Sequence, residues 1–225
     1  MAGAQGTDVQ RMQSQWLGDW RRYLARMYAP GGGTALEVGC GAGFVMSDLS
    51  DLLHIKGIDI DPVQVGLAKE RGMDVKEGDG LSLRYDDGSF DIVLCSFYLM
   101  WVKDMQGAVD EMLRVSKNGA LILSEPVWSR SLYAPEGLKA VVDAWTYVIA
   151  KEGGDPEAGL KTAELVGRYG GRFGSVPVEM GREAMEKNVA FEYSTLKAKG
   201  IKLRKVRPFM FQVPFIWGFV PKDLN

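Results

Sequence analysis

Glycine recurs at every second position in one short string, Glu37–Gly43, which begins with an acidic residue. Because glycine has no Cβ atom, a loop of this kind lets the backbone approach a bound ligand closely. Few residues are available for other kinds of catalytic or binding site. The chain has one histidine and two cysteines, a poor basis for a metal site, a Ser-His-Asp arrangement or a disulfide framework. The glycine string is therefore the first candidate for a binding site.

The spacing of these glycines excludes two common nucleotide-binding loops. A dinucleotide loop reads G-x-G-x-x-G, but the sixth position is Phe44 when counted from Gly39 and Met46 when counted from Gly41. A phosphate-binding loop ends in G-K-[ST], and no lysine occurs between residues 31 and 56. What remains is the pattern acidic-x-Gly-x-Gly-x-Gly.

The elements around the string indicate an α/β sheet. From Ala35 to about Pro126, apolar runs alternate with stretches of helical period, which is typical of βαβ units on a parallel sheet. In an open sheet of this kind, ligands bind beyond the carboxyl ends of the strands. The expected strands are Thr34–Val38, His54–Ile60, Met73–Lys76, Phe90–Ser96 and Ala120–Ser124.

At Glu37–Gly43 the sequence resembles the class I S-adenosylmethionine (SAM) dependent methyltransferases, of the small-molecule, methyltransferase-11 (UbiE-like) type. The resemblance covers Thr34 to about Pro126 and implies a Rossmann-like fold with SAM as cofactor and S-adenosylhomocysteine as product. A loop without lysine suits a zwitterionic methionine tail better than a pyrophosphate. Glu37 adds negative potential, which favours the ammonium and the sulfonium.

The resemblance also implies roles for residues that follow later strands. Asp59 is expected to accept hydrogen bonds from the ribose hydroxyls, whereas Asp61 precedes Pro62 and is interpreted as a helix N-cap. Asp79 lies where family members accept from the adenine amino group, with ordinary turn chemistry as its alternative. The cofactor-binding residues expected on this basis are Glu37, Gly39, Cys40, Gly41, Gly43, Asp59, Ile60, Asp79, Gly80, Ser96 and Phe97.

Segments outside this core are expected to cover it. Apolar spacing predicts an N-terminal helix over Gln13–Tyr28, and the glycine-rich segment 131–188 is interpreted as a mostly helical insertion that forms a lid. Two terminal β runs, Ile201–Phe211 and Phe215–Val220, are expected to pair as an antiparallel hairpin on the sheet edge. We therefore expect one domain over 1–225, a doubly wound, mostly parallel sheet of seven strands with a helical insertion.

The methyl acceptor is expected beyond the fourth and fifth strands. The substrate candidates are Tyr98, Trp101, Trp128, Tyr133 and Trp145, each with core packing as its alternative. Deprotonation of a hydroxyl acceptor would fall to Glu125, Asp104, Tyr98, Tyr133 or water; Glu125 and Tyr98 are the catalytic candidates. Arg21 or Arg22 is a candidate for the SAM carboxylate. We expect no metal.

Composition limits the partners. Lys and Arg total 27 against 29 Asp and Glu, a net charge of −2 that disfavours a dedicated nucleic-acid binder. No apolar run approaches the roughly 18 residues of a membrane span, and Met1–Asp8 has no features of a secretion signal, so we expect a cytoplasmic protein without membrane contact. A basic run over Lys197–Arg207 is interpreted as a solvated edge strand rather than a nucleic-acid patch.

The sequence thus predicts a SAM-dependent methyltransferase that acts on a small-molecule acceptor. One alternative is an RNA or protein methyltransferase that uses the basic terminal hairpin. Another is a non-catalytic module that binds SAM. The acceptor and the oligomeric state are not assigned by any motif.

Overall fold

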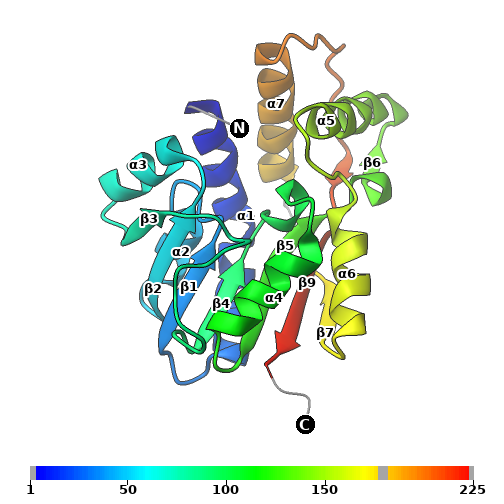
Figure 1. Cartoon of the computed structure of the whole chain (residues 1–225). Helices are drawn as coiled ribbons and strands as arrows, with labels where there is room; N and C mark the ends of the chain where they lie inside the picture. Colours follow the sequence, from blue (N-terminus) through cyan, green and yellow to red (C-terminus); the bar gives the residue numbers. More distant parts are fainter. Residues whose placement is uncertain (1–3, 177–181, 223–225) are drawn as a thin grey trace.

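A computed structural model describes residues 4–176 and 182–222. Its centre is a seven-stranded sheet with the order β3-β2-β1-β4-β5-β9-β7 (Figure 1). The class expected from the sequence, a Rossmann-like α/β fold with a mostly parallel sheet, is confirmed. The strands are β1 (Thr34–Val38), β2 (His54–Asp59), β3 (Val75–Glu77), β4 (Ile92–Cys95), β5 (Gly119–Pro126), β7 (Arg172–Ser175) and β9 (Phe215–Pro221).

The terminal β segments pair differently from the expected hairpin. β9 is antiparallel to both of its neighbours: Val220 pairs with Ala120 of β5, and Phe219 pairs with Arg172 of β7. The strand before it, β8 (Met210–Gln212), pairs instead with β6 (Leu132–Ala134) in a separate two-stranded sheet. The expected edge strand over Ile201–Phe211 is therefore wrong, because most of that segment runs outside any strand.

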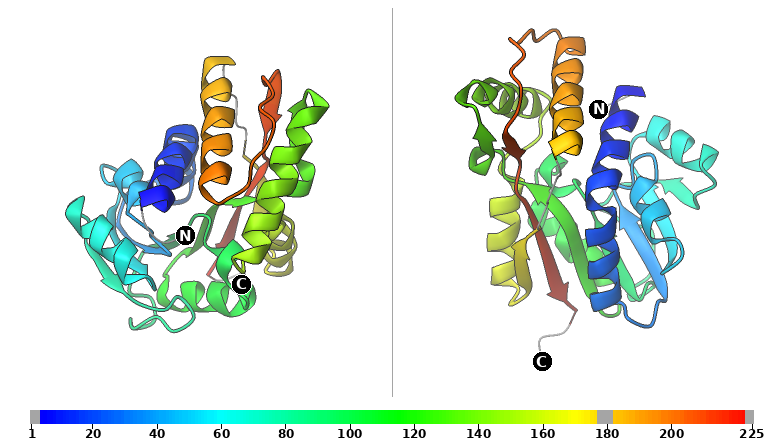
Figure 2. Two further views of the ribbon diagram at one scale, coloured as in Figure 1. Left: turned by 90° about the horizontal axis from the view of Figure 1, so that it is seen from above. Right: turned by 180° about the vertical axis from the view of Figure 1, so that it is seen from behind.

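Helices cover both faces of the sheet, as a buried parallel sheet requires. Side chains alternate along β5: Leu121 and Leu123 pack with α1 and α2, whereas Ala120 and Ile122 pack with α4 and α6. Figure 1 shows α4 and α6 on the near face, and the rear view in Figure 2 shows α1 on the other. These helices are α1 (Ala4–Tyr28), α2 (Phe44–Leu49), α4 (Met105–Val115) and α6 (Ala158–Arg168); α3 (Pro62–Glu70) packs near β3.

A further layer stands over the carboxyl ends of the strands. It contains α5 (Lys139–Lys151) and α7 (Arg182–Ala198), whose apolar faces share one core with Leu17 of α1. Both views in Figure 2 place the N-terminal half of α1 beside α7. Three short 3-10 helices, η1 (Leu99–Trp101), η2 (Trp128–Arg130) and η3 (Glu136–Leu138), connect these parts.

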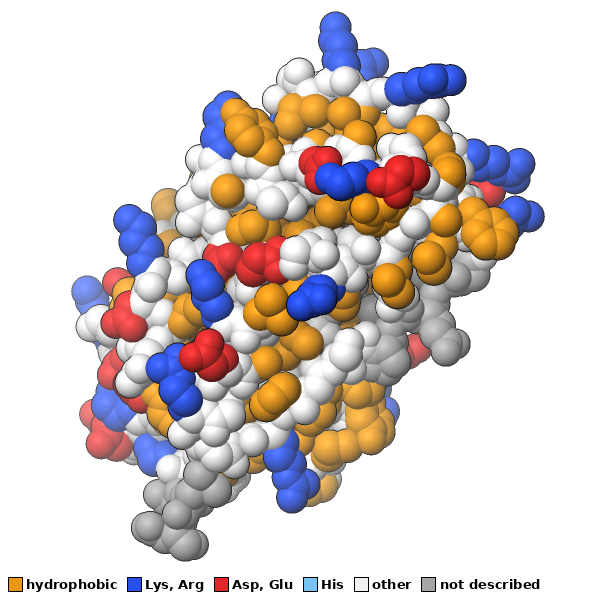
Figure 3. Space-filling view, turned by 90° about the vertical axis from the view of Figure 1, so that its right-hand side faces the viewer, with side chains coloured by type: hydrophobic (Ala, Val, Ile, Leu, Met, Phe, Trp, Pro, Cys, Tyr) orange, Lys and Arg blue, Asp and Glu red, His pale blue; other side chains and the backbone are white. Residues whose placement is uncertain are grey.

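Segment 131–188 holds α5, α6 and the start of α7. It also supplies β7 at the sheet edge, where no strand was expected. Figure 3 looks at the side of the molecule that carries this segment, where apolar side chains lie between charged ones. Within the described residues, no helix is long and apolar enough to cross a membrane.

Candidate functional site

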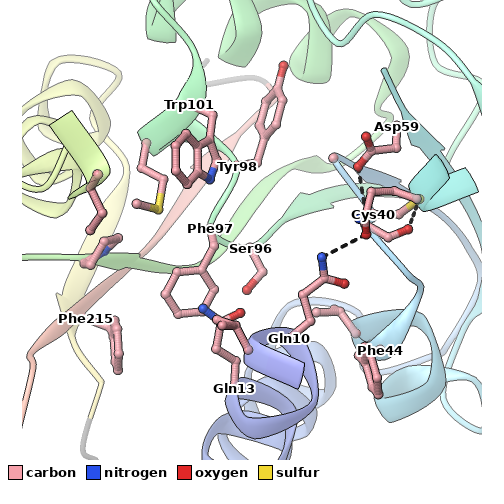
Figure 4. A pocket seen from close by; sticks show the side chains of 18 of the residues that line it. Gln10, Gln13, Cys40, Phe44, Asp59, Ser96, Phe97, Tyr98, Trp101 and Phe215 are labelled. Carbon is pink, nitrogen blue, oxygen red and sulfur yellow. Dashed lines mark hydrogen bonds between the residues drawn. The ribbon is translucent and has the colours of Figure 1, made fainter. Parts of the chain in front are cut away.

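A cavity of about 690 Å³ lies where the carboxyl ends of the strands meet α1, α5 and α7. This volume is in the range of small-molecule sites. Its two ends differ in chemistry, as Figure 4 shows: Cys40, Asp59 and Gln10 lie at one end, and Phe97, Trp101 and Phe215 lie toward the other. We refer to them as the glycine-loop end and the aromatic end.

The glycine loop is tied to the end of β2 by one carboxylate. Asp59 Oδ2 accepts from the Gly41 backbone N–H at 2.8 Å, and Oδ1 accepts from the Asp61 N–H at 2.9 Å. Gly39 and Gly41 have φ of 70° and 52°, a region that favours glycine. Burial raises the pKa of Asp59, whereas the two N–H groups oppose that shift. Asp59 thus shapes the loop and also faces the cavity.

Tyr98 fills the space that two glycines leave open. A Cβ atom on Gly39 would lie 2.5 Å from the Tyr98 ring, and one on Gly80 would collide with the Tyr98 hydroxyl. Burial raises the pKa of Tyr98, so its phenol stays protonated at neutral pH. Tyr98 lines the cavity, but its geometry gives it a packing role at the glycine-loop end, and the expected role as a base is not supported.

Two buried polar atoms at the glycine-loop end have no hydrogen-bond partner: Glu37 Oε2 and Arg21 Nε. Both residues line the cavity and are about 1% exposed. Arg21 is held by Asp48 at 3.0 Å and by the Ser96 hydroxyl at 3.2 Å. Burial raises the pKa of Glu37, and Arg21 opposes that shift. An acidic group and a guanidinium that line the same end of the cavity fit the ammonium and the carboxylate of an amino-acid ligand.

Gln10 of α1 joins this end of the cavity and was not expected from the sequence. Its Oε1 accepts from the Ala42 backbone N–H at 2.8 Å, and its Nε2 donates to Gln64 Oε1 at 3.0 Å. Gln10 precedes the helix predicted from apolar spacing, which began at Gln13. A polar side chain outside an apolar pattern gives no signal of its own.

Glu125, a catalytic candidate from the sequence, does not line the cavity, so the expected catalytic role does not fit its position. Its side chain is fully buried in β5. Oε1 accepts from the backbone N–H groups of Tyr98 and Leu99, and Oε2 accepts from that of Met100, at 2.7–3.1 Å. Burial raises its pKa to about 8 against the effect of these three donors. The carboxyl group therefore holds the segment after β4 in place.

The aromatic end is built from segments far apart in the sequence. Phe97 has φ of 52°, which is unusual for a residue with a side chain, and its ring meets Phe215 edge-on at 5.2 Å between centroids. The rings of Trp128 and Trp145 stack at 6.1 Å. Trp101 also lines this end. Such walls favour an apolar or aromatic ligand.

Most of the residues predicted from the sequence come together at the cavity. Gly43, Glu125 and Tyr133 do not line it: Gly43 is the N-cap of α2, and Tyr133 packs on the apolar core under α5. Asp79 lines the cavity and also accepts from the Leu81 N–H at 2.9 Å, so its turn role is present. The predicted residues that line the cavity are Glu37, Gly39, Cys40, Gly41, Asp59, Ile60, Asp79, Gly80, Ser96, Phe97, Tyr98, Trp101, Trp128 and Trp145.

The sequence analysis also missed the contribution of α7. Asn188, Phe191 and Glu192 line the cavity from this helix. Met185, Val189, Tyr193 and Leu196 give α7 an ordinary apolar face, but the pattern does not say that its neighbouring polar residues turn inward as well. The basic run that follows α7 is not an edge strand, and Arg207 pairs with Glu186 at 3.0 Å.

Comparisons with known proteins agree with this geometry. Residues 36–124 match a family model described as "Methyltransferase domain". This part of the chain is therefore similar to methyltransferase domains, and we refer to residues 36–124 as the methyltransferase domain. The methyltransferase domain contains the glycine loop, Asp59 and Asp79 of the glycine-loop end, whereas Gln10 and Arg21 come from α1.

Two curated relatives match part of the chain. Ajmaline N-methyltransferase of Rauvolfia serpentina is 38% identical over 98 residues, or 39% of this chain and 34% of that protein. Demethylmenaquinone methyltransferase of Oceanobacillus iheyensis is 31% identical over 116 residues, or 46% of this chain and 49% of that protein. The chain thus spans half or less of the length of these relatives.

Solved structures share the fold over most of the chain. The PH0226 protein of Pyrococcus horikoshii superposes with a TM-score of 0.59 at 14% identity, covering 94% of this chain and 90% of that one. The YcgJ protein of Bacillus subtilis superposes with a TM-score of 0.53 at 18% identity, covering 84% of this chain and 92% of that one. At such identities the likeness concerns the fold alone.

Proposed function

We propose that the chain is a SAM-dependent methyltransferase that transfers a methyl group to a small-molecule acceptor. One observation carries the proposal: a glycine loop with a buried carboxylate and guanidinium, each with an unpaired polar atom, opens into the same cavity as an aromatic chamber. The loop contains no lysine, which favours a zwitterionic ligand over a pyrophosphate. The methyltransferase domain supports the same cofactor.

In this proposal the residues of the glycine-loop end bind and orient the cofactor. Glu37 and Arg21 face its amino-acid group, Asp59 accepts from ribose hydroxyls, and Asp79 lies toward the adenine. When bound, SAM supplies an activated methyl group on a sulfonium. The remaining catalytic contribution of the chain is alignment of the acceptor and exclusion of water by the aromatic end, which needs no side-chain base.

The cofactor assignment is tested by calorimetric titration with SAM and S-adenosylhomocysteine, with NADH and ATP as controls. We expect Asp59→Ala to weaken binding of both SAM compounds by about 30- to 700-fold, because two charge-assisted hydrogen bonds are lost. Asp143→Ala is the matched control, since Asp143 pairs with Lys139 on the exposed face of α5. Unchanged affinity of Asp59→Ala for both SAM compounds would contradict the role of Asp59 in binding the ribose.

Catalysis itself needs a second assay. SAM with a labelled methyl group is incubated with the protein and a panel of small amines, phenols and thiols, and transfer is followed by mass spectrometry. Transfer to a small molecule supports the proposal. Binding of SAM without transfer to any member of the panel would favour the non-catalytic module instead.

A further inference from the structure

One carboxyl group at the cavity has no part in the function proposed above. Glu192 lies on α7, its side chain is 8% exposed, and it lines the cavity together with Phe191 of the same helix. It comes from outside the methyltransferase domain, which ends at residue 124. Burial of a carboxyl group is costly unless a partner compensates for the lost water.

Three cations on α7 or close after it are engaged by other acids. Lys187 pairs with Glu183 at 2.7 Å, Arg207 pairs with Glu186, and Lys199 pairs with Glu152. No ion pair among the described residues involves Glu192. The Trp145 indole N–H lies close enough to favour the ionised carboxylate, but it makes no hydrogen bond of regular geometry. The protein therefore leaves this carboxyl group without a cation of its own.

The walls near Glu192 suit a cation as well as an apolar group. Trp145 lines the cavity and approaches the carboxyl group, and its ring stacks on that of Trp128. Aromatic faces attract cations, and a carboxylate beside them adds a charge-assisted hydrogen bond. Around the whole cavity, six acidic residues outnumber the two basic residues, Arg21 and Lys103. A bound cation favours the ionised form of an acid beside it, so this lining favours ligands with positive charge.

We propose that Glu192 binds the amino group of the acceptor, which is a basic amine with an aromatic or apolar body. This inference rests on the proposed function, because it assigns the substrate class of the same cavity. The amine replaces the water that Glu192 loses on burial, and the tryptophan rings hold the apolar body. A neutral alcohol or a carboxylate of the same shape lacks the positive charge and is bound less well.

The test uses three probes of one shape and different charge: tryptamine, tryptophol and indole-3-acetate. Each is titrated by calorimetry into the full chain saturated with S-adenosylhomocysteine. For the unaltered protein we expect tryptamine to bind at least about tenfold more tightly than tryptophol, and indole-3-acetate to bind most weakly. Glu192→Gln is expected to weaken tryptamine by about tenfold or more and to leave tryptophol within about threefold.

Glu183→Gln is the matched control, because it makes the same substitution on the exposed side of α7. It should preserve the preference for tryptamine. The inference is overturned if tryptamine shows no preference over the neutral probe, if Glu192→Gln keeps that preference, or if none of the probes binds at millimolar concentration. If the chain binds S-adenosylhomocysteine but fails these criteria, only this inference is contradicted. If the chain does not bind S-adenosylhomocysteine, the proposed function is contradicted as well.

Discussion

At the scale of single residues, the position of a carboxyl group in the sequence does not reveal which way it faces. Glu125 and Glu192 are both deeply buried acids, and the pKa of each is raised to about 8 by burial. Glu125 follows the strand run that precedes the acceptor region, yet three backbone N–H groups occupy its oxygens. Glu192 lies in a segment with no motif, yet it lines the cavity.

We expect Glu125→Ala to destabilise the protein by about 3–5 kcal/mol, because it leaves buried N–H groups without an acceptor. Glu125→Gln keeps one acceptor oxygen and should cost about half as much. Chemical denaturation measures both free energies of unfolding. Normal stability combined with complete loss of methyl transfer would contradict the structural role and return Glu125 to catalysis.

Glu192 should also make stability depend on pH. Its pKa is about 8 in the folded chain against 4.5 for a solvated glutamate, so the folded state keeps a proton that the unfolded state releases. Stability is therefore lost as pH rises from about 4.5 to about 8. Glu192→Gln removes this contribution. The free energy of unfolding of the variant minus that of the unaltered protein should therefore be larger at pH 8 than at pH 5, by roughly 2–5 kcal/mol. A difference that is independent of pH would contradict this assignment.

At the scale of elements, one residue of α2 accepts three hydrogen bonds from α1. Asp48 accepts from Ser14 Oγ at 2.6 Å and from Arg21 at 3.0 Å, and its backbone carbonyl accepts from Arg22 at 2.7 Å. Arg21 is almost fully buried, and burial lowers its pKa. The N-terminal half of α1 brings Gln10 to the glycine loop, so this attachment also positions part of the site.

Replacing Asp48 should release α1 and leave the sheet intact. In Asp48→Ala, Arg21 becomes a buried charge without its anion, a change that costs about 3–5 kcal/mol. Hydrogen exchange followed by mass spectrometry should show faster exchange along α1 and little change in β1 or β4. Asp51→Ala is the control, because Asp51 forms an exposed pair with Arg22 and should cost less than about 1 kcal/mol. Equal effects of the two substitutions would contradict this account.

The sequence predicted those elements whose signals are local. β1 has its expected bounds, β2 differs by one residue, and Asp61 caps α3 by accepting from the Val63 N–H at 2.9 Å. The predicted terminal hairpin was wrong because strand periodicity does not indicate which strand a segment pairs with. β7 was missed because it is short, contains glycine and is largely exposed, so it shows no apolar alternation. The glycine loop was found from its motif, whereas Gln10 and Glu192 depend on helix orientation, which tertiary packing decides.

At the scale of the whole molecule, the cavity joins parts of the chain from α1 to β9. A ligand that binds there therefore stabilises all of these parts in the folded state. At a concentration one hundred times its dissociation constant, such a ligand adds about 2.7 kcal/mol to stability. For a chain of this size we expect S-adenosylhomocysteine to raise Tm by about 5–10 °C at that concentration. Differential scanning calorimetry checks this, with NADH as the control; a shift with NADH alone would favour another cofactor.

The place of β9 between β5 and β7 has a consequence for the newly made chain. β5 and β7 both leave the ribosome before β9, yet neither can complete its pairing until β9 arrives between them. During that interval β5 presents an open, apolar edge, which is a template for pairing with other chains. We therefore expect synthesis that stalls before Phe215 to yield a chain that aggregates or recruits chaperones, although every segment of the methyltransferase domain is already present.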